Sequence, residues 1–179
     1  MISPRGLVVC VGFDDFLSVT LPGNMRFMAS CLVITSPDDE PTKAIARSVP
    51  GVEVFETTAF TDHNAVFNKG LAVHQALDYL GREGWLLIWD ADTILPPTAD
   101  FSSAEPGYLY GARRLVLDDA TRWHPGFDWR LARPHRDDPA VGYFQLFHAD
   151  SEPLRGQRVW YDVTFAHAGG CDADRKSVV

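Results

Sequence analysis

The stretch that most constrains the fold is an apolar run that ends on two aspartates. Five apolar residues follow one another from Trp85 to Trp89, Asp90 and Asp92 come next, and Pro96-Pro97 closes the stretch. An apolar run of this length, bounded by prolines, predicts a strand that is buried on both faces of a sheet. The two aspartates at its carboxyl end then lie where open α/β sheets bind their ligands.

Asp90 and Asp92 allow two interpretations. Two neighbouring carboxylates resist being ionised together unless a cation or hydrogen bonds offset their charge. Their oxygens are also the ligands that Mg²⁺ and similar hard cations prefer. One interpretation is therefore a divalent metal that holds a phosphorylated ligand. The alternative is an acidic turn after the strand, in which Asp92 caps the segment that follows.

The bulk composition predicts one ordinary globular domain. The chain has 179 residues, of which 46% are hydrophobic and 22% are charged, which is enough for a substantial core. Its net charge of −8 argues against a generally basic nucleic-acid-binding surface, although it allows a local basic patch. The apolar run at residues 7–11 is too short for a signal or membrane segment. Cys10 and Cys31 lie in apolar runs, which indicates buried thiols and a reducing, cytoplasmic location.

The first half of the chain alternates between strand and helix patterns. Strands are predicted at 7–11, 31–35 and 52–55, and helices at 13–21 and 40–47, with Pro22-Gly23 ending the first helix. This alternation is typical of an α/β fold with a mostly parallel central sheet and crossover helices. Asp38 or Asp39 can cap the second helix or can contact a ligand.

A longer helix is predicted over residues 65–80, directly before the apolar run. Lys69 lies in its first turn, where a cation is unfavourable for the helix dipole. A position beside a metal-bound diphosphate would explain this cation. An exposed surface lysine is an equally good interpretation.

The chain changes character after Pro97. Short strands are predicted at 107–111, 114–117 and 142–148, and the segment Arg113–Arg136 interleaves aromatic residues with arginines. Such a segment can form a stacking and phosphate-binding surface, including one for DNA. The favoured interpretation is an irregular loop that its aromatic residues pin in place, neutralised by Asp128, Asp137 and Asp138.

A second cluster of chemistry-bearing residues follows Thr164. It contains a histidine, two glycines and two acids: His167, Gly169, Gly170, Asp172 and Asp174. Glycines allow a backbone to approach a ligand closely. Asp172 would serve as a base if a metal neutralised the charge around it.

Three segments together resemble the GT-A glycosyltransferases, which use nucleotide sugars, and in particular their family 2 and galactosyltransferase-like groups. The segments are Phe67-Asn68-Lys69-Gly70, Trp89-Asp90-Ala91-Asp92 and Gly169-Gly170-Cys171-Asp172-Ala173-Asp174, and they occur in the family's order. The resemblance implies a GT-A (Rossmann-like) fold, which is a three-layer α/β/α sandwich. It also implies a single domain over 1–179, with a nucleotide-sugar-binding half at 1–97 and an acceptor and catalytic half at 98–179.

The resemblance implies a role for each matching position. Asp92 would bind Mn²⁺ or Mg²⁺ directly, and Asp90 would reach the donor ribose, the metal or a metal-bound water. His167 would be a further metal ligand. The base that deprotonates the acceptor hydroxyl would be Asp172, or Asp174 if the alignment is shifted by two residues. The remaining positions would contact the donor: Asp38, Asp39, Lys69, Gly169 and Gly170.

The implied activity is the transfer of a sugar from a nucleotide sugar to an acceptor hydroxyl, with inversion favoured. A UDP-sugar is the favoured donor by family resemblance. The acceptor stays open between a saccharide, a protein or lipid carrier, and a hydroxymethylated base in DNA, which the segment Arg113–Arg136 would bind.

Two other classes of function compete with this prediction. A phosphatase of the haloacid dehalogenase type also places Asp-x-Asp after an apolar strand, with Asp90 as nucleophile and Asp92 as general acid. That motif normally opens the phosphatase fold, whereas three predicted strands precede it here. A non-catalytic module that binds nucleotide sugars or saccharides would use the metal pair without Asp172.

Overall fold

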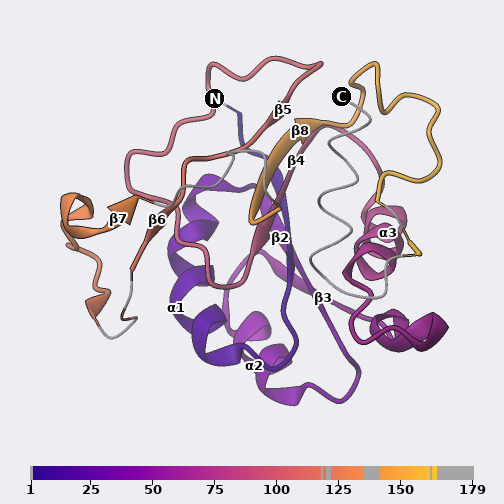
Figure 1. Ribbon diagram of the computed structural model, residues 1–179, viewed down its shortest axis with the longest axis horizontal. Helices are drawn as coiled ribbons and strands as arrows, with labels where there is room; N and C mark the ends of the chain where they lie inside the picture. The colour runs from indigo at the N-terminus through magenta and orange to yellow at the C-terminus, as the bar shows by residue number, and fades with distance from the viewer. Residues whose placement is uncertain (1, 118, 120–121, 135–141, 162, 165–179) are drawn as a thin grey trace.

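Four parallel strands form the centre of the protein in the computed structural model, which describes residues 2–117, 119, 122–134, 142–161 and 163–164. The strands are β1 (Arg5–Val9), β2 (Ser30–Thr35), β3 (Val52–Glu56) and β4 (Trp85–Asp90). Next to β4 lies β8 (Phe144–His148), which is antiparallel to it, and β5 (Leu109–Tyr110) is the outermost strand. The complete order is β3-β2-β1-β4-β8-β5 (Figure 1).

Helices cover both faces of this sheet. On one face lie α1 (Asp14–Asn24) and α2 (Glu40–Ser48), and on the other lies α3 (Lys69–Leu80) (Figure 1). The described residues include the short 3₁₀ turns η1 (Met25–Phe27), η2 (Ala59–Asn64) and η4 (Trp129–Leu131). A separate two-stranded sheet consists of β6 (Leu115–Val116) and β7 (Arg133–Pro134). The predicted three-layer α/β/α architecture with a mostly parallel sheet is confirmed.

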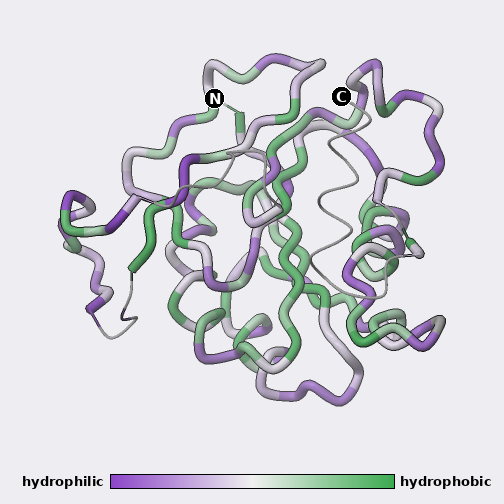
Figure 2. The backbone as a smooth tube through the Cα atoms, viewed as in Figure 1, coloured by the Kyte–Doolittle hydropathy of each residue, from purple (hydrophilic) through white to green (hydrophobic). Residues whose placement is uncertain are grey.

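The apolar run from Trp85 to Trp89 forms the buried strand β4, which ends at Asp90. Successive residues of a strand point to opposite faces. Leu86 and Ile88 accordingly pack into the core beneath α3, while Leu87 and Trp89 pack into the core beneath α1 and α2. Figure 2 shows hydrophobic residues along the central strands. Burial on both faces explains why β4 is uninterrupted by polar residues.

The order of the strands creates a switch point between β1 and β4. The chain passes from β1 through α1 to β2, and then through α2 to β3, moving steadily in one direction. It then returns through α3, on the opposite face, to place β4 on the other side of β1. Ligands of open α/β sheets bind outside the carboxyl ends of the strands at such a point. Asp90 is the last residue of β4 and therefore lies there.

Two helix boundaries differ from the sequence prediction. The predicted helix at 65–80 begins only at Lys69, because Asn68 is the cap and its side chain accepts a hydrogen bond from Leu71 N at 2.9 Å. The first helix continues through Pro22 and ends at Asn24. Pro22 has no backbone N–H to donate to the preceding turn, and α1 ends two residues later at Asn24.

Two further expectations concern the cysteines and membrane-spanning segments. Cys10 and Cys31 are buried free thiols, as predicted. Within the described part of the chain, every helix is too short or too polar to cross a bilayer.

Candidate functional site

An ion pair joins the end of β4 to the start of α3. Asp90 follows Leu86 and Ile88 at intervals of two residues, so its side chain points to the face that α3 covers. Lys69, the first residue of α3, places its Nζ 2.9 Å from Asp90 Oδ1. The side chain of Lys69 is only 8% exposed, whereas that of Asp90 is 38% exposed. Asp90 thus offsets the buried cation and remains partly accessible to a ligand.

Asp92 lies two residues beyond Asp90 and in a less favourable environment for a negative charge. Burial is the largest cause that raises the pKa of Asp92, and the neighbouring Asp90 carboxylate raises it further. The cations of Arg114 and Lys69 act in the opposite direction. A carboxylate that is held in this way gains from a nearby divalent cation, because the cation offsets both burial and like-charge repulsion.

The loop that carries Asp92 is held in place by α1. Thr20 Oγ1 donates to Ala91 O at 2.7 Å, and Asn24 Nδ2 donates to Thr93 O at 2.9 Å. Asn24 Oδ1 also accepts a hydrogen bond from Leu95 N at 2.9 Å. Both side chains are buried. These contacts fix the loop backbone on either side of Asp92.

Sequence reasoning missed Thr20 and Asn24. Their spacing of four residues puts both on one helix face, and Leu17 and Leu21 of the same helix are buried. Two polar residues on the buried side of an amphipathic helix are a signal that could have been noticed, because buried polar groups need hydrogen-bond partners. The signal would not have revealed that the partners belong to the loop after β4.

Asp90 and Asp92 line a cleft of about 790 Å³ at the switch point. One wall comes from the first turns of α1, which contribute Asp15, Phe16, Val19 and Thr20. Another comes from residues around β6 and β7: Arg113, Arg114, Arg133, Trp123 and Trp129. The volume lies within the range of small-molecule sites, about 300 to 1,000 Å³.

The segment Arg113–Arg136 divides into two parts, and a phosphate-binding or DNA-binding role for it stays a prediction. Arg130 forms a bidentate ion pair with Asp128, with Nη2 to Oδ2 at 2.8 Å, as the favoured interpretation of a neutralised loop predicts. Trp123, Phe127 and Trp129 pack together, with ring centroids 5.4 to 6.2 Å apart. Arg113, Arg114 and Arg133 instead line the cleft. Arg136 lies outside the described residues.

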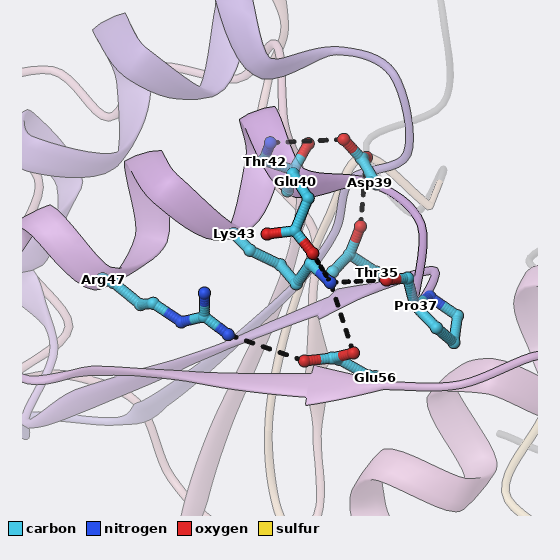
Figure 3. Close-up of polar contacts among 8 residues, drawn as sticks. All are labelled: Thr35, Pro37, Asp39, Glu40, Thr42, Lys43, Arg47 and Glu56. Atoms are coloured by element: carbon cyan, nitrogen blue, oxygen red, sulfur yellow. Dashed lines mark hydrogen bonds and ion pairs between the residues drawn. The ribbon is translucent and has the colours of Figure 1, made fainter.

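Asp39 is engaged in the fold beside the carboxyl ends of β1 and β2. Its Oδ1 accepts from Thr42 N at 3.2 Å, which caps α2, and its Oδ2 accepts from Thr35 Oγ1 at 3.1 Å (Figure 3). The same Oδ2 also accepts from Gly12 N at 2.9 Å. Partial burial raises the pKa of Asp39, but these hydrogen bonds outweigh burial and the net shift is downward. Asp39 therefore fixes the loop after β1.

Asp38 and Lys43 complete this region. Asp38 is exposed, and the Ser36 hydroxyl lowers its pKa, so it is available to a ligand. The buried Lys43 donates to Pro37 O at 2.5 Å and pairs with Glu40 at 2.6 Å and Glu56 at 3.4 Å (Figure 3). Nucleoside recognition by Asp38 or Asp39 stays a prediction.

The second predicted cluster lies outside the described residues. This applies to His167, Gly169, Gly170, Asp172 and Asp174. The last described residues nevertheless lie near the site. Asn68 Nδ2 donates to Val163 O at 2.8 Å, and Asn68 immediately precedes the lysine that pairs with Asp90. Tyr161 also contacts Gln145 of β8 through a buried hydrogen bond. The chain at Val163 therefore lies beside the amino end of α3.

The donor set of Asp90 and Asp92 fits a magnesium- or manganese-type cation. Within the described residues, no group of three or more histidine, cysteine, aspartate or glutamate side chains is placed to hold a metal ion. A Mg²⁺ that binds phosphates uses only one or two protein carboxylates, and the phosphates and water provide its other ligands. Asp92 and the cleft offer that arrangement.

Comparison with known proteins identifies no family for this chain. No protein-family model and no curated protein matches it. Among solved structures, a 4-diphosphocytidyl-2C-methyl-D-erythritol synthase gives a TM-score of 0.48 at 17% identity, covering 99% of this chain and 87% of that one. The synthase of the same name from Anaerococcus prevotii gives 0.45 at 13% identity, with 82% and 72% covered. Likenesses this distant assign no activity, and the resemblance to glycosyltransferases stays a prediction.

Proposed function

We propose that this protein is a metal-dependent glycosyltransferase that moves a sugar from a nucleoside diphosphate sugar to an acceptor hydroxyl. The observation that carries the proposal is the position of Asp90 and Asp92. Asp90 is the last residue of the central strand at the switch point of the sheet, and Asp92 follows it in the next loop. Both line one cleft, so carboxylates suited to a metal lie where open α/β sheets bind their ligands.

In this proposal Asp92 is the direct ligand of Mn²⁺ or Mg²⁺, and Lys69 keeps Asp90 oriented toward the ribose or a metal-bound water. The metal would supply positive charge to the diphosphate as the sugar departs. Thr20 and Asn24 hold the loop of Asp92 at its place, which limits the reorganisation that binding requires.

The acceptor half of the reaction rests on the resemblance. Asp172 is the proposed base, with Asp174 as its substitute, and His167 is a proposed third metal ligand. Gly169 and Gly170 would allow the backbone to approach the donor. A UDP-sugar is the proposed donor, and inversion is the proposed stereochemistry.

The first test is calorimetric titration with UDP, UDP-glucose, GDP and GDP-mannose, each with Mn²⁺ and with EDTA. We expect a diphosphate compound to bind only with the metal, and we expect Asp92→Asn to abolish that binding. The matched control is Asp150→Asn, because Asp150 is exposed and follows β8 at the opposite end of β4. Binding of equal strength with EDTA, or in Asp92→Asn, would contradict the proposal.

Turnover assays separate the competing classes. Sugar transfer that Asp172→Asn removes supports the glycosyltransferase. Metal-dependent binding without turnover indicates a binding module, and release of inorganic phosphate from a phosphate ester indicates a phosphatase. Three strands precede β4 in the chain. This order disfavours the phosphatase, whose Asp-x-Asp motif normally opens the fold. An assay with CTP in place of the nucleotide sugar, in which released pyrophosphate is detected, tests transfer of a nucleotidyl group.

A further inference from the structure

The cleft has a second wall that the metal and donor do not require. It consists of Arg113, Arg114, Arg133, Trp123 and Trp129, and we call it the arginine–tryptophan wall. Arg133 belongs to β7, which pairs with β6 in a sheet separate from the one that carries Asp90, and the other four residues lie in the chain around these two strands. Asp15, Asp90 and Asp92 also line the cleft, so the three guanidinium groups lie on this wall while the carboxylates come from other elements.

The arginines of this region differ in what surrounds them. Arg130, which is not among the residues lining the cleft, lies in a bidentate pair with Asp128. The guanidinium carbon of Arg114 lies 4.9 Å from the centre of the Tyr143 ring. The positive charge of Arg114 acts to lower the pKa of Asp92. Arg113 is exposed at the cleft. Arg130 is thus held by Asp128 outside the cleft, whereas Arg113, Arg114 and Arg133 line it.

The two tryptophans give the wall a flat apolar part. Trp123 and Trp129 lie 5.4 Å apart between ring centroids, and Phe127 is buried against both of them. Both tryptophans are half-buried, so part of each ring faces the cleft. Packing on a buried aromatic side chain holds such rings in place and lowers the entropy cost of stacking a ligand on them.

We infer that the arginine–tryptophan wall binds the acceptor, and that this acceptor carries a phosphate ester next to a ring. The inference rests on the proposed function, in which the metal at Asp92 already holds the diphosphate of the donor. A neutral acceptor would gain little from three guanidinium groups, whereas the planar fork of arginine matches a phosphate with two parallel hydrogen bonds. The ring would stack on Trp123 or Trp129. A phosphorylated sugar and a nucleotide unit of single-stranded DNA share this chemistry.

Binding can be measured without donor or metal, by titration in EDTA while following tryptophan fluorescence. The probes are glucose 6-phosphate, glucose and a short oligothymidylate. We expect at least one phosphate-bearing probe to bind, with an affinity that falls steeply with added salt, and glucose to bind at least about tenfold more weakly. This tenfold difference corresponds to losing one charged hydrogen bond. The probe that binds more tightly identifies the source of the phosphate.

Matched variants connect the signal to the wall. Arg113→Gln and Arg133→Gln should each weaken binding of the phosphate-bearing probe about tenfold, and Trp129→Phe should reduce the fluorescence change. Arg130→Gln removes an arginine of the same region that is paired with Asp128, and it should leave the affinity unchanged. Circular dichroism and urea midpoints establish that each variant is folded.

Three results would overturn the inference: neither phosphate-bearing probe binds, glucose binds equally well, or Arg130→Gln is as damaging as Arg133→Gln. The outcome is separate from that of the donor site, because EDTA removes the metal. Mn²⁺-dependent UDP binding without binding of a phosphate ester would leave the proposed function standing and exclude this acceptor class. Binding of a phosphate ester in EDTA without Mn²⁺-dependent nucleotide binding would overturn the proposed function alone.

Discussion

Lys69 Nζ lies 2.9 Å from Asp90 Oδ1, which joins the first residue of α3 to the last residue of β4. The cation at the start of a helix, unfavourable for the helix dipole, is therefore offset by a carboxylate of the candidate site. The sequence left Lys69 open between a ligand contact and an exposed surface position. Its burial excludes the exposed position.

We expect Lys69→Met to destabilise the protein by about 2 kcal/mol, because a charged hydrogen bond is lost while Asp90 stays partly solvated. A double-mutant cycle with Asp90→Asn, measured by urea unfolding, isolates the pair. The coupling energy should be about 1 to 2 kcal/mol. The exposed pair of Arg130 and Asp128 is the control and should show no measurable coupling. Additive effects of the Lys69 and Asp90 substitutions would show that the pair contributes nothing to stability.

Asn24 should affect both stability and ligand binding. Asn24→Ala leaves Leu95 N and Thr93 O without their partner, which should cost about 2 to 3 kcal/mol. The freed loop should also weaken Mn²⁺-dependent binding of the nucleotide. Asn24→Asp keeps an acceptor for Leu95 N but buries a carboxylate against Thr93 O, so it should be no more stable than Asn24→Ala. Urea midpoints and calorimetry distinguish the two effects, and wild-type affinity in Asn24→Ala would show that the loop does not depend on α1.

The elements of the fold were largely predictable, because each is determined by local patterns. The unbroken apolar run of β4 requires burial on both faces, and Asp39 and Asn68 are standard helix caps. The error at the start of α3 concerns residues 65–68, because the 3₁₀ turn η2 ends at Asn64 and α3 begins only after its cap, Asn68. The extension of α1 through Pro22 depends instead on Asn24, whose partners lie about seventy residues away.

The candidate site was predictable only in part for the same reason. Asp90 and Asp92 lie two residues apart in sequence and were found from that spacing. Arg130 pairs with Asp128, two residues earlier, whereas Arg113, Arg114 and Arg133 reach the cleft through the placement of β6 and β7, which no local pattern encodes. Arg113 and Arg130 look equivalent in sequence, yet only Arg113 lines the cleft.

Burial predicts the reactivity of the thiols. Burial raises the pKa of Cys31 to about 12, with an opposing contribution from Trp89, and it also raises the pKa of Cys10. Reaction requires the thiolate, so both should resist a thiol reagent in the folded protein at pH 8. In a Cys171→Ser variant we expect no rapid reaction under native conditions and two reactive thiols in guanidinium. Rapid labelling of the folded variant would contradict the burial of these cysteines.

Asp39 predicts how stability depends on pH. The folded-state pKa of this carboxyl lies below its ordinary value, because hydrogen bonds from Gly12, Thr42 and Thr35 outweigh the effect of partial burial. The stabilisation is therefore fully present above the unfolded pKa, about 3.9. It is lost as the pH falls through the lower folded pKa.

An Asp39→Ala variant loses the cap of α2 and the contact with Gly12, and should be less stable at pH 7 by about 1 to 2 kcal/mol. Urea midpoints of the variant and the wild type should converge as the pH falls from 5 toward 3, because protonation removes the same hydrogen bonds in the wild type. Exposed Asp62 of η2 provides the control: Asp62→Ala tests whether any lost carboxylate gives the same pH profile. A difference between Asp39→Ala and wild type that stays constant over this range would show that the charge of Asp39 is not what stabilises the loop.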